Sequence, residues 1–202
     1  KKEIDEMEYL AEFFLQNGAF GIHFGLEFFP GTSEEEIIRL SKVCERHNRI
    51  ISVHLRKDGR EALNYFDEII HAAEISGVSV QILQLMYMVG INGAMKDALT
   101  IIENAQNRGI DITADSGVYD AFCACIGTSI FDEGWELEYG KHGYRALLVS
   151  SGIYTGRYCD KELFHRLRDD FPHTSITAFV CDTEDIPLAL SKPYVYVSTN
   201  AA

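Results

Sequence analysis

Hydrophobic residues follow two alternating patterns along the first half of the chain. Short apolar runs, the first punctuated by glycines, begin near residues 18, 49, 78 and 110, at a spacing of about 30 residues. Between these runs, apolar residues recur at the three- and four-residue spacing of an amphipathic helix. Because about 30 residues is the length of one βα unit, the pattern predicts parallel strands that alternate with helices.

The ends of the predicted helices carry recognisable signals. Residues 32–36, with the sequence TSEEE, combine a capping hydroxyl with acidic residues in a first turn, which predicts a helix that runs to about Arg46. Residues 61–76 have helical spacing and are followed by Gly77, which suits a helix C-cap. Residues 93–108 form the next predicted helix, again with a glycine behind it.

The second half of the chain is less regular. Residues 116–138 lack a clear period and are interpreted as a long loop with short helical pieces. Further strands are predicted over residues 146–150, 174–180 and 194–198, and helices over residues 160–170 and 185–191. No linker or low-complexity segment divides the chain, so residues 1–202 are predicted to form one domain.

Two α/β architectures fit this pattern, a doubly wound sheet and a (β/α)8 barrel. Doubly wound folds that bind nucleotides carry a glycine-rich phosphate loop at the start of a helix. The candidate here, GING at residues 90–93, is too short for that loop. A doubly wound binding domain is therefore the weaker alternative.

Charge and cysteine content narrow the class of protein further. A net charge of −13 argues against nucleic acid and anionic membranes as partners, because both bind clustered Lys and Arg. No apolar run approaches the ~18 residues of a membrane span, and the charged N-terminal stretch lacks the apolar core of a signal peptide. Five cysteines, an odd number without a paired framework, favour a reducing cytoplasm. Cys123 and Cys125 form a C-x-C pair that suits a soft metal, but no second pair or nearby histidine completes such a site.

Polar residues gather where the predicted strands end. In parallel α/β folds, chemistry collects at the carboxyl ends of the strands. These positions hold one histidine, one arginine, one aspartate and two amides: His54, Arg56, Asp115, Gln84 and Asn200. Imidazole and carboxylate at this edge suit a divalent metal that activates water. For Asp115 the favoured alternative is a cap on the following turn.

Several ordered segments resemble a known family. They are GAFGIHFGLEFFPGTSEEEIIRLSKV at residues 18–43, ISVHLR at 51–56, VSVQILQL at 78–85, RGIDITAD at 108–115 and PYVYVSTNA at 193–201. Together they resemble the N-acyl-D-amino-acid deacylase (D-aminoacylase) branch of the amidohydrolase superfamily, with dihydroorotases and hydantoinases as more distant relatives. The resemblance implies a metal-dependent (β/α)8 TIM-type barrel that hydrolyses an amide bond with a zinc-activated water. This chain would cover about strands 4 to 8 of that barrel.

The resemblance assigns metal-site positions residue by residue. The family's histidine after its fifth strand falls on His54, within SVHLR. Its histidine after the sixth strand falls on Gln84, within QILQL, and its catalytic aspartate after the eighth strand falls on Asn200, within STNA. The family's opening His-x-His has no match, nor has the Cys, Glu or carboxylated Lys that helps hold the metals. The two amides alter the chemistry, because Asn cannot take a proton from water and Gln is a poor zinc ligand beside imidazole.

Two residues are candidates for contact with substrate. Arg56 has the bidentate geometry to pair a substrate carboxylate, and the alternative is a salt bridge to one of the many acidic residues. Tyr119 falls where the family offers substrate-contacting groups, and the alternative is a packed aromatic side chain. His23, inside the first predicted strand, is expected to have a structural role.

Two hypotheses for function follow. The first is a metal-dependent hydrolase, with zinc as cofactor, that cleaves the amide bond of an N-acyl amino acid or a related amide. The second is a catalytically inactive or fragmentary relative that binds a ligand or partner without turnover. The chain lacks an initiator Met, which is consistent with a fragment of a longer protein. Five strands of an eight-stranded barrel leave two unpaired edges, so a chain of this kind, if alone, is expected to pair with another copy or with missing chain.

Overall fold

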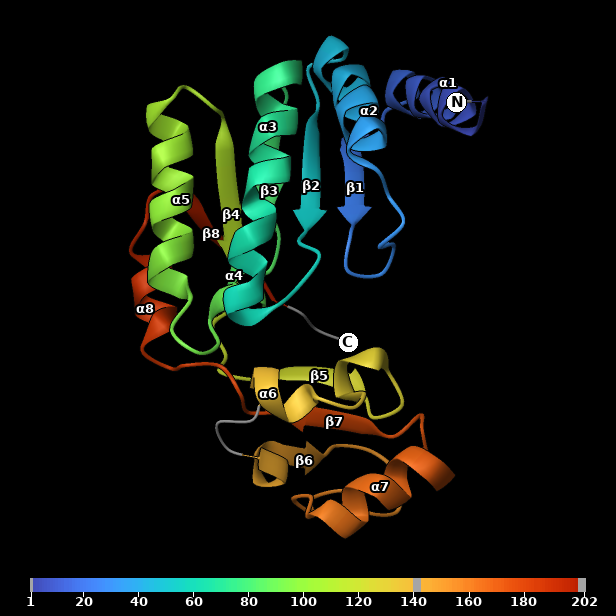
Figure 1. The fold of residues 1–202 in the computed structure, drawn as a ribbon, viewed down its shortest axis with the longest axis vertical. Helices are drawn as coiled ribbons and strands as arrows, with labels where there is room; N and C mark the ends of the chain where they lie inside the picture. The colour runs from blue at the N-terminus through green and yellow to red at the C-terminus, as the bar shows by residue number, and fades with distance from the viewer. Residues whose placement is uncertain (1, 140–142, 200–202) are drawn as a thin grey trace.

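Two separate β-sheets organise the chain in the computed structural model, which describes residues 2–139 and 143–199. The larger sheet has five parallel strands in the order β1-β2-β3-β4-β8. The smaller sheet has three antiparallel strands in the order β5-β7-β6 and lies beyond the carboxyl ends of β1 and β2 (Figure 1). The predicted parallel α/β architecture is confirmed, although the described residues form an open sheet and not a closed barrel.

The elements have the following bounds. The strands of the larger sheet are β1 (Gly21–Gly25), β2 (Ile50–His54), β3 (Ser79–Ile82), β4 (Ile112–Ser116) and β8 (Val195–Val197). The helices around this sheet are α1 (Lys2–Gln16), α2 (Glu34–Arg46), the 3-10 helix η1 (Gly59–Tyr65), α3 (Phe66–Ser76), α4 (Leu85–Val89), α5 (Met95–Asn107) and α8 (Asp185–Leu190). The smaller part contains β5 (Phe122–Cys125), η2 (Ser129–Phe131), α6 (Trp135–Tyr139), η3 (Gly143–Ala146), β6 (Leu147–Val149), α7 (Lys161–Asp170) and β7 (Ser175–Ala178).

The predicted helix ends are largely confirmed by their capping contacts. The hydroxyl of Ser33 accepts a hydrogen bond from the Glu36 amide at 3.2 Å, so α2 begins where the TSEEE signal predicts. Gly77 ends α3 in the left-handed region, at φ 76°, and its amide donates to the Ala73 carbonyl at 2.7 Å. One difference is that the start of this predicted helix is the 3-10 helix η1.

Helices α2, α3 and α5 cover one face of the larger sheet (Figure 1). Strand residues that point to this face are apolar and fully buried, as Ile51, Val53 and Ile82 show. They pack against helix residues such as Val43 and Ile70 in one continuous core. The apolar faces of the helices, which repeat every 3.6 residues, therefore pack against the apolar face of the sheet, which repeats every two residues along each strand.

The smaller sheet belongs to an insert, here defined as residues 117–182, which leaves the larger sheet after β4 and returns before α8. The strands predicted over residues 146–150 and 174–180 are confirmed as β6 and β7, but they pair antiparallel outside the main sheet. The interpretation of residues 116–138 as loop and helical pieces was wrong for β5. Its four residues, FCAC, are too few to show a period.

The two ends of the insert lie side by side. The amide of Cys181, where the chain leaves the insert, donates to the carbonyl of Asp120, where the chain enters it, at 3.1 Å. The next amide, of Asp182, donates to the Gly90 carbonyl at 2.7 Å and so joins the insert to the larger part. A further hydrogen bond, from the Tyr139 hydroxyl to the Asp58 carboxylate, links α6 to the loop after β2.

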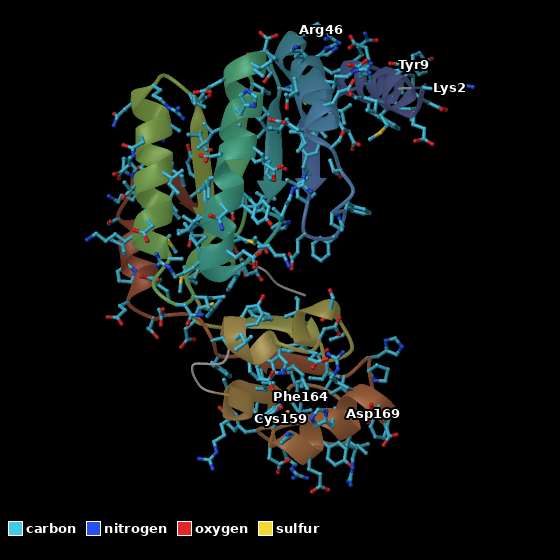
Figure 2. All side chains as sticks on the ribbon, in the orientation of Figure 1. Lys2, Tyr9, Arg46, Cys159, Phe164 and Asp169 are labelled. Carbon is cyan, nitrogen blue, oxygen red and sulfur yellow. The ribbon has the colours of Figure 1, made fainter. Side chains whose placement is uncertain are left out.

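The insert has an aromatic core of its own. Phe164 of α7 is 2 % exposed and lies inside the insert, as Figure 2 shows. Its ring stacks on Trp135 at 5.3 Å between centroids and also contacts Phe131 and Tyr144. Edge-to-face and offset stacked rings of this kind stabilise a small core beyond the area that they bury.

Helix α1, for which we made no prediction, projects from the edge of the larger part (Figure 1). Arg39 and Arg46 of α2 hold it through ion pairs with three of its acidic residues, Asp5, Glu8 and Glu12. Among the described residues no helix is long and apolar enough to cross a membrane. All five cysteines are free thiols.

A substitution at Gly21 tests the close approach of β1 and β2. A Cβ atom on Gly21 would collide with the backbone carbonyl of Ile50, which cannot move without breaking the strand pairing. We expect Gly21→Ala to lower the free energy of unfolding by about 1–3 kcal/mol in urea denaturation, the usual cost of overpacking. Gly31→Ala is the matched control, because a Cβ atom there meets nothing within 4 Å. Equal stability of the two variants would contradict the pairing.

Candidate functional site

The face of the larger sheet opposite the helices is polar near the strand ends. Strand register places His23, Ser52, Gln81 and Thr113 in one row across β1 to β4. Two residues further along, His54 and Asp115 occupy the same face on β2 and β4. The strands are parallel, so these side chains converge at one edge of the sheet, as the sequence predicts for His54 and Asp115.

His54 stands at the carboxyl end of β2 with both ring nitrogens buried and without a hydrogen-bond partner. Its ring meets the rings of His23 and Phe28 edge to face, at 5.3 and 6.3 Å between centroids. Burial lowers the pKa of His54, and His23 adds to this effect, while the nearby Gln84 side chain and Asp115 carboxylate oppose it. Burial therefore favours the neutral imidazole, in which one ring nitrogen keeps a lone pair.

Asp115 joins three strands through its carboxylate and is 6 % exposed. One oxygen accepts from the Gln84 amide at 2.9 Å and from the Ser198 hydroxyl at 2.6 Å. The other accepts from the Gln81 side-chain amide at 2.9 Å. These three donors come from β3, the turn after it and the end of β8, so Asp115 fixes the arrangement of the strand ends.

Gln84 adopts the left-handed conformation, with φ 55° and ψ 43°, directly after β3. A residue other than glycine is uncommon in this region, and such strain is retained where the surroundings enforce it. The hydrogen bond to Asp115 is one such constraint, and the Gln84 carbonyl also accepts from the first amides of α4, those of Tyr87 and Met88. Gln84 therefore connects the carboxylate network to the start of a buried helix.

The predicted substrate-binding residues lie apart from this network. Arg56 donates to the Glu68 carboxylate at 2.7 and 3.1 Å, and to the carbonyls of Pro30 and Thr32 at 3.1 and 2.7 Å. The structure thus shows the ion pair that was the alternative for Arg56, and contact with substrate stays a prediction. Tyr119 is 61 % exposed, after β4 at the start of the insert. Asn200 lies outside the described residues.

A cleft of about 450 Å³ lies between the strand ends and the insert. Its lining from the larger part consists of Glu27, Phe28, Asp58, Gln84, Tyr87 and Met88. Its lining from the insert consists of Phe122–Cys125 and residues 128–130. This size is typical of small-molecule sites, and the mixture of aromatic walls with few polar groups is also typical. Of the predicted site residues, Gln84 lines the cleft; His54 does not, but its ring meets that of the lining residue Phe28 edge to face.

The described residues do not make a complete metal site. Within residues 2–139 and 143–199, no three His, Cys, Asp or Glu side chains are grouped so as to hold a metal ion. His54 suits a metal, because burial favours its neutral imidazole and its nitrogens have no hydrogen-bond partner among the described residues, and His23 lies beside it. The Asp115 oxygens are already hydrogen-bonded, and Gln84 offers only a neutral amide. Further ligands would have to come from outside the described residues.

The fold has clear relatives among solved structures. D-aminoacylase superposes with a TM-score of 0.76 at 21% identity, and N-acyl-D-glutamate deacylase from Bordetella bronchiseptica, complexed with zinc and a phosphonate inhibitor, with 0.78 at 17%. Each match covers 97% of this chain and 42% of the solved chain. No protein-family model and no curated protein matches the sequence. At this identity the likeness establishes the fold, and it confirms at that level the predicted resemblance to D-aminoacylase-type amidohydrolases.

Replacement of Asp115 by asparagine tests the carboxylate network. Asp115→Asn replaces a charged carboxylate that accepts three hydrogen bonds. The new amide NH2 group would face groups that are themselves donors. We expect the free energy of unfolding in urea to fall by about 1.5–3 kcal/mol. Asp111→Asn is the control, since this exposed residue accepts one side-chain hydrogen bond, from Ser79. A loss at Asp115 no larger than at Asp111 would count against the network.

The lowered pKa of His54 predicts a pH dependence of stability. Because the folded state binds the proton more weakly than the unfolded chain, stability should fall as the pH drops below about 6.5. The fall should end below the folded-state pKa. In urea denaturation with a chelator present, His54→Gln should reduce this pH dependence, whereas His173→Gln, at an exposed position, should leave it unchanged. Parallel pH profiles for the original chain and His54→Gln would refute the assignment.

Proposed function

We propose that this chain forms about strands 4 to 8 of an amidohydrolase-type (β/α)8 barrel, and that the intact protein hydrolyses the amide bond of an N-acyl amino acid or related amide. The observation that carries the proposal is that His54 and Asp115, at the carboxyl ends of two strands of the parallel sheet, share one face with the polar row across β1 to β4. The fold similarity to D-aminoacylase and N-acyl-D-glutamate deacylase supports the same substrate class. The chain spans only 42% of those proteins, so the activity belongs to the proposal for the intact protein.

The roles of individual residues follow from their places at the strand ends. His54 would hold a divalent cation, zinc by analogy with the Bordetella bronchiseptica deacylase, together with ligands from outside the described residues. Asp115 would position the turn that carries Gln84. Tyr119, at the exposed start of the insert, would contact the substrate. Arg56 would do so only if a ligand displaced part of its ion pair with Glu68.

A second candidate function is ligand binding without turnover. It is favoured by one observation, that the described residues contain no group of three or more possible metal ligands, where the resemblance implies a fuller set. Gln84, a neutral amide at the position that the resemblance gives to a family histidine, also favours binding without turnover. The cleft would then bind a small amide but lack the groups that activate water.

Metal content and hydrolysis separate the two functions. We expect the full-length protein, purified without chelator, to contain zinc by elemental analysis and to release free amino acid from a panel of N-acyl-D-amino acids. The double variant Gln84→His, Asn200→Asp should raise metal content and rate, because it supplies an imidazole and a carboxylate. Gln16→His, on the exposed side of α1, controls for an added histidine.

The opposite outcome is equally informative. If neither the original protein nor the double variant contains metal or releases amino acid, the hydrolase proposal is wrong, and binding without turnover replaces it. Metal gain in Gln16→His equal to that in the double variant would mean adventitious binding.

A further inference from the structure

The edge of β5 that faces away from β7 lines the cleft. Within the described part of the chain β5 pairs with β7 alone, and it is the strand of the insert nearest to the ends of the larger sheet's strands (Figure 1). All four of its residues, Phe122–Cys125, line the cleft, although their side chains alternate between the two faces of the small sheet. This is expected when a strand presents its backbone edge, and not one face, to a cavity.

The hydrogen-bond pattern of the small sheet shows which backbone groups lie on that edge. The Ile126 amide donates to the Thr174 carbonyl, in line with the register that pairs Ala124 with Ile176. In an antiparallel pair, hydrogen-bonded residues alternate with residues whose backbone groups point away from the partner. Cys123 and Cys125 are therefore the residues whose amides and carbonyls point outward.

The pairing of β7 with β6 agrees with this assignment. The Ser150 amide donates to the Ser175 carbonyl, and the Phe179 amide donates to the Ala146 carbonyl. The odd-numbered residues of β7 thus bond to β6, which leaves the even-numbered ones for β5. Two independent sets of hydrogen bonds give the same orientation for the backbone of Cys123.

Three outward backbone groups remain for a ligand. The Cys125 carbonyl is already occupied, since it accepts from the amide and the hydroxyl of Thr128 at 3.1 and 2.8 Å. The amide and carbonyl of Cys123 and the amide of Cys125 make no hydrogen bond to any residue that the structure describes. An N–H and a C=O on one residue match one residue of an extended peptide, which offers the complementary pair.

We propose that this edge binds a short, extended, peptide-like ligand by main-chain hydrogen bonds, as an added strand. Cys123 would pair with one ligand residue, and the Cys125 amide would reach a carbonyl two residues along the ligand, about 6.7 Å away. The ligand class is therefore an extended peptide with two or more peptide bonds, and its N-acylation rests on the function proposed above. Turnover of such a ligand rests on the function proposed above, whereas its binding does not.

The surroundings of the edge suit this ligand. Phe28, Tyr87 and Met88 line the same cleft from the larger part and give it apolar and aromatic surface. Gln84 adds an amide that can donate and accept, which matches a peptide group. A volume of about 450 Å³ holds a few residues but not a folded partner.

The first test keeps the protein unchanged and alters the probe. N-acetyl-alanyl-phenylalanyl-alanine N-methylamide, in L and D forms, is titrated into the full-length protein by calorimetry, with its amides N-methylated one at a time. Methylation of the amide that faces β5 should weaken binding about 5- to 10-fold, the effect of one lost hydrogen bond, while methylation of the amides beside it should not. No binding, or equal losses at every amide, would overturn the proposal.

The second test removes the amide donor of Cys123. Proline is tolerated on a sheet edge where the N–H points away from the partner strand, so Cys123→Pro should keep the small sheet intact. It should bind the unmethylated probe about 5- to 10-fold more weakly, with an unchanged melting midpoint. Cys123→Ser keeps the backbone amide and should bind like the original protein. If Cys123→Ser weakens binding as much as Cys123→Pro, the thiol and not the edge is responsible, and the proposal is wrong.

The outcome is independent of catalysis. Probe binding with the alternating pattern, but without metal or amide hydrolysis, would support the edge and refute the hydrolase proposal. Hydrolysis of single N-acyl amino acids without any binding of the peptide probe would support the hydrolase proposal and refute peptide binding at the β5 edge.

Discussion

The structure depends on the strict alternation of side chains along parallel strands. Every second residue of β1 to β4 must face the covering helices, and those positions hold the fully buried apolar residues, such as Val53 and Ile82. The polar residues between them can only face the other side. His23, His54 and Asp115 therefore share that face because of strand alternation alone. A shift of one residue in register would turn the polar residues toward the helices and the apolar residues away from them.

The larger sheet could be predicted from the sequence because its signals are local and repeated. Four βα units gave strand positions, and caps such as Ser33 and Gly77 gave helix ends close to those observed. The last strand, β8, was predicted from its own sequence and the family resemblance, but its pairing with β4 was not, because some 80 residues separate the two strands in the chain. Within the insert β6, β7 and α7 were predicted, but β5 and the separate antiparallel sheet were not, for a different reason. The insert's strands have three or four residues each and its sheet is held by pairings distant in sequence.

The candidate site was only partly predictable. A polar residue at a strand end is visible in the sequence, so His54, Gln84 and Asp115 could be named. Their partners could not, because Asp115 takes donors from residues 31 to 83 positions away, and Arg56 takes an acceptor from the helix that follows its own strand. The contact between His23 and His54 arises from register, which a period-two count of β1 and β2 could have indicated. The cleft is lined partly by β5 of the insert, which was not predicted, so the cleft could not be predicted either.

The neighbouring ends of the insert also bear on how such a protein changes over generations. Asp120 and Cys181 are joined by one backbone hydrogen bond, so the chain leaves and rejoins the main sheet at almost the same point. An excursion of this kind can be lengthened, shortened or exchanged without altering the order of the strands that carry His54 and Asp115. Gene duplicates could therefore diversify what they recognise by remodelling this one segment, while the strand-end groups stay under separate selection.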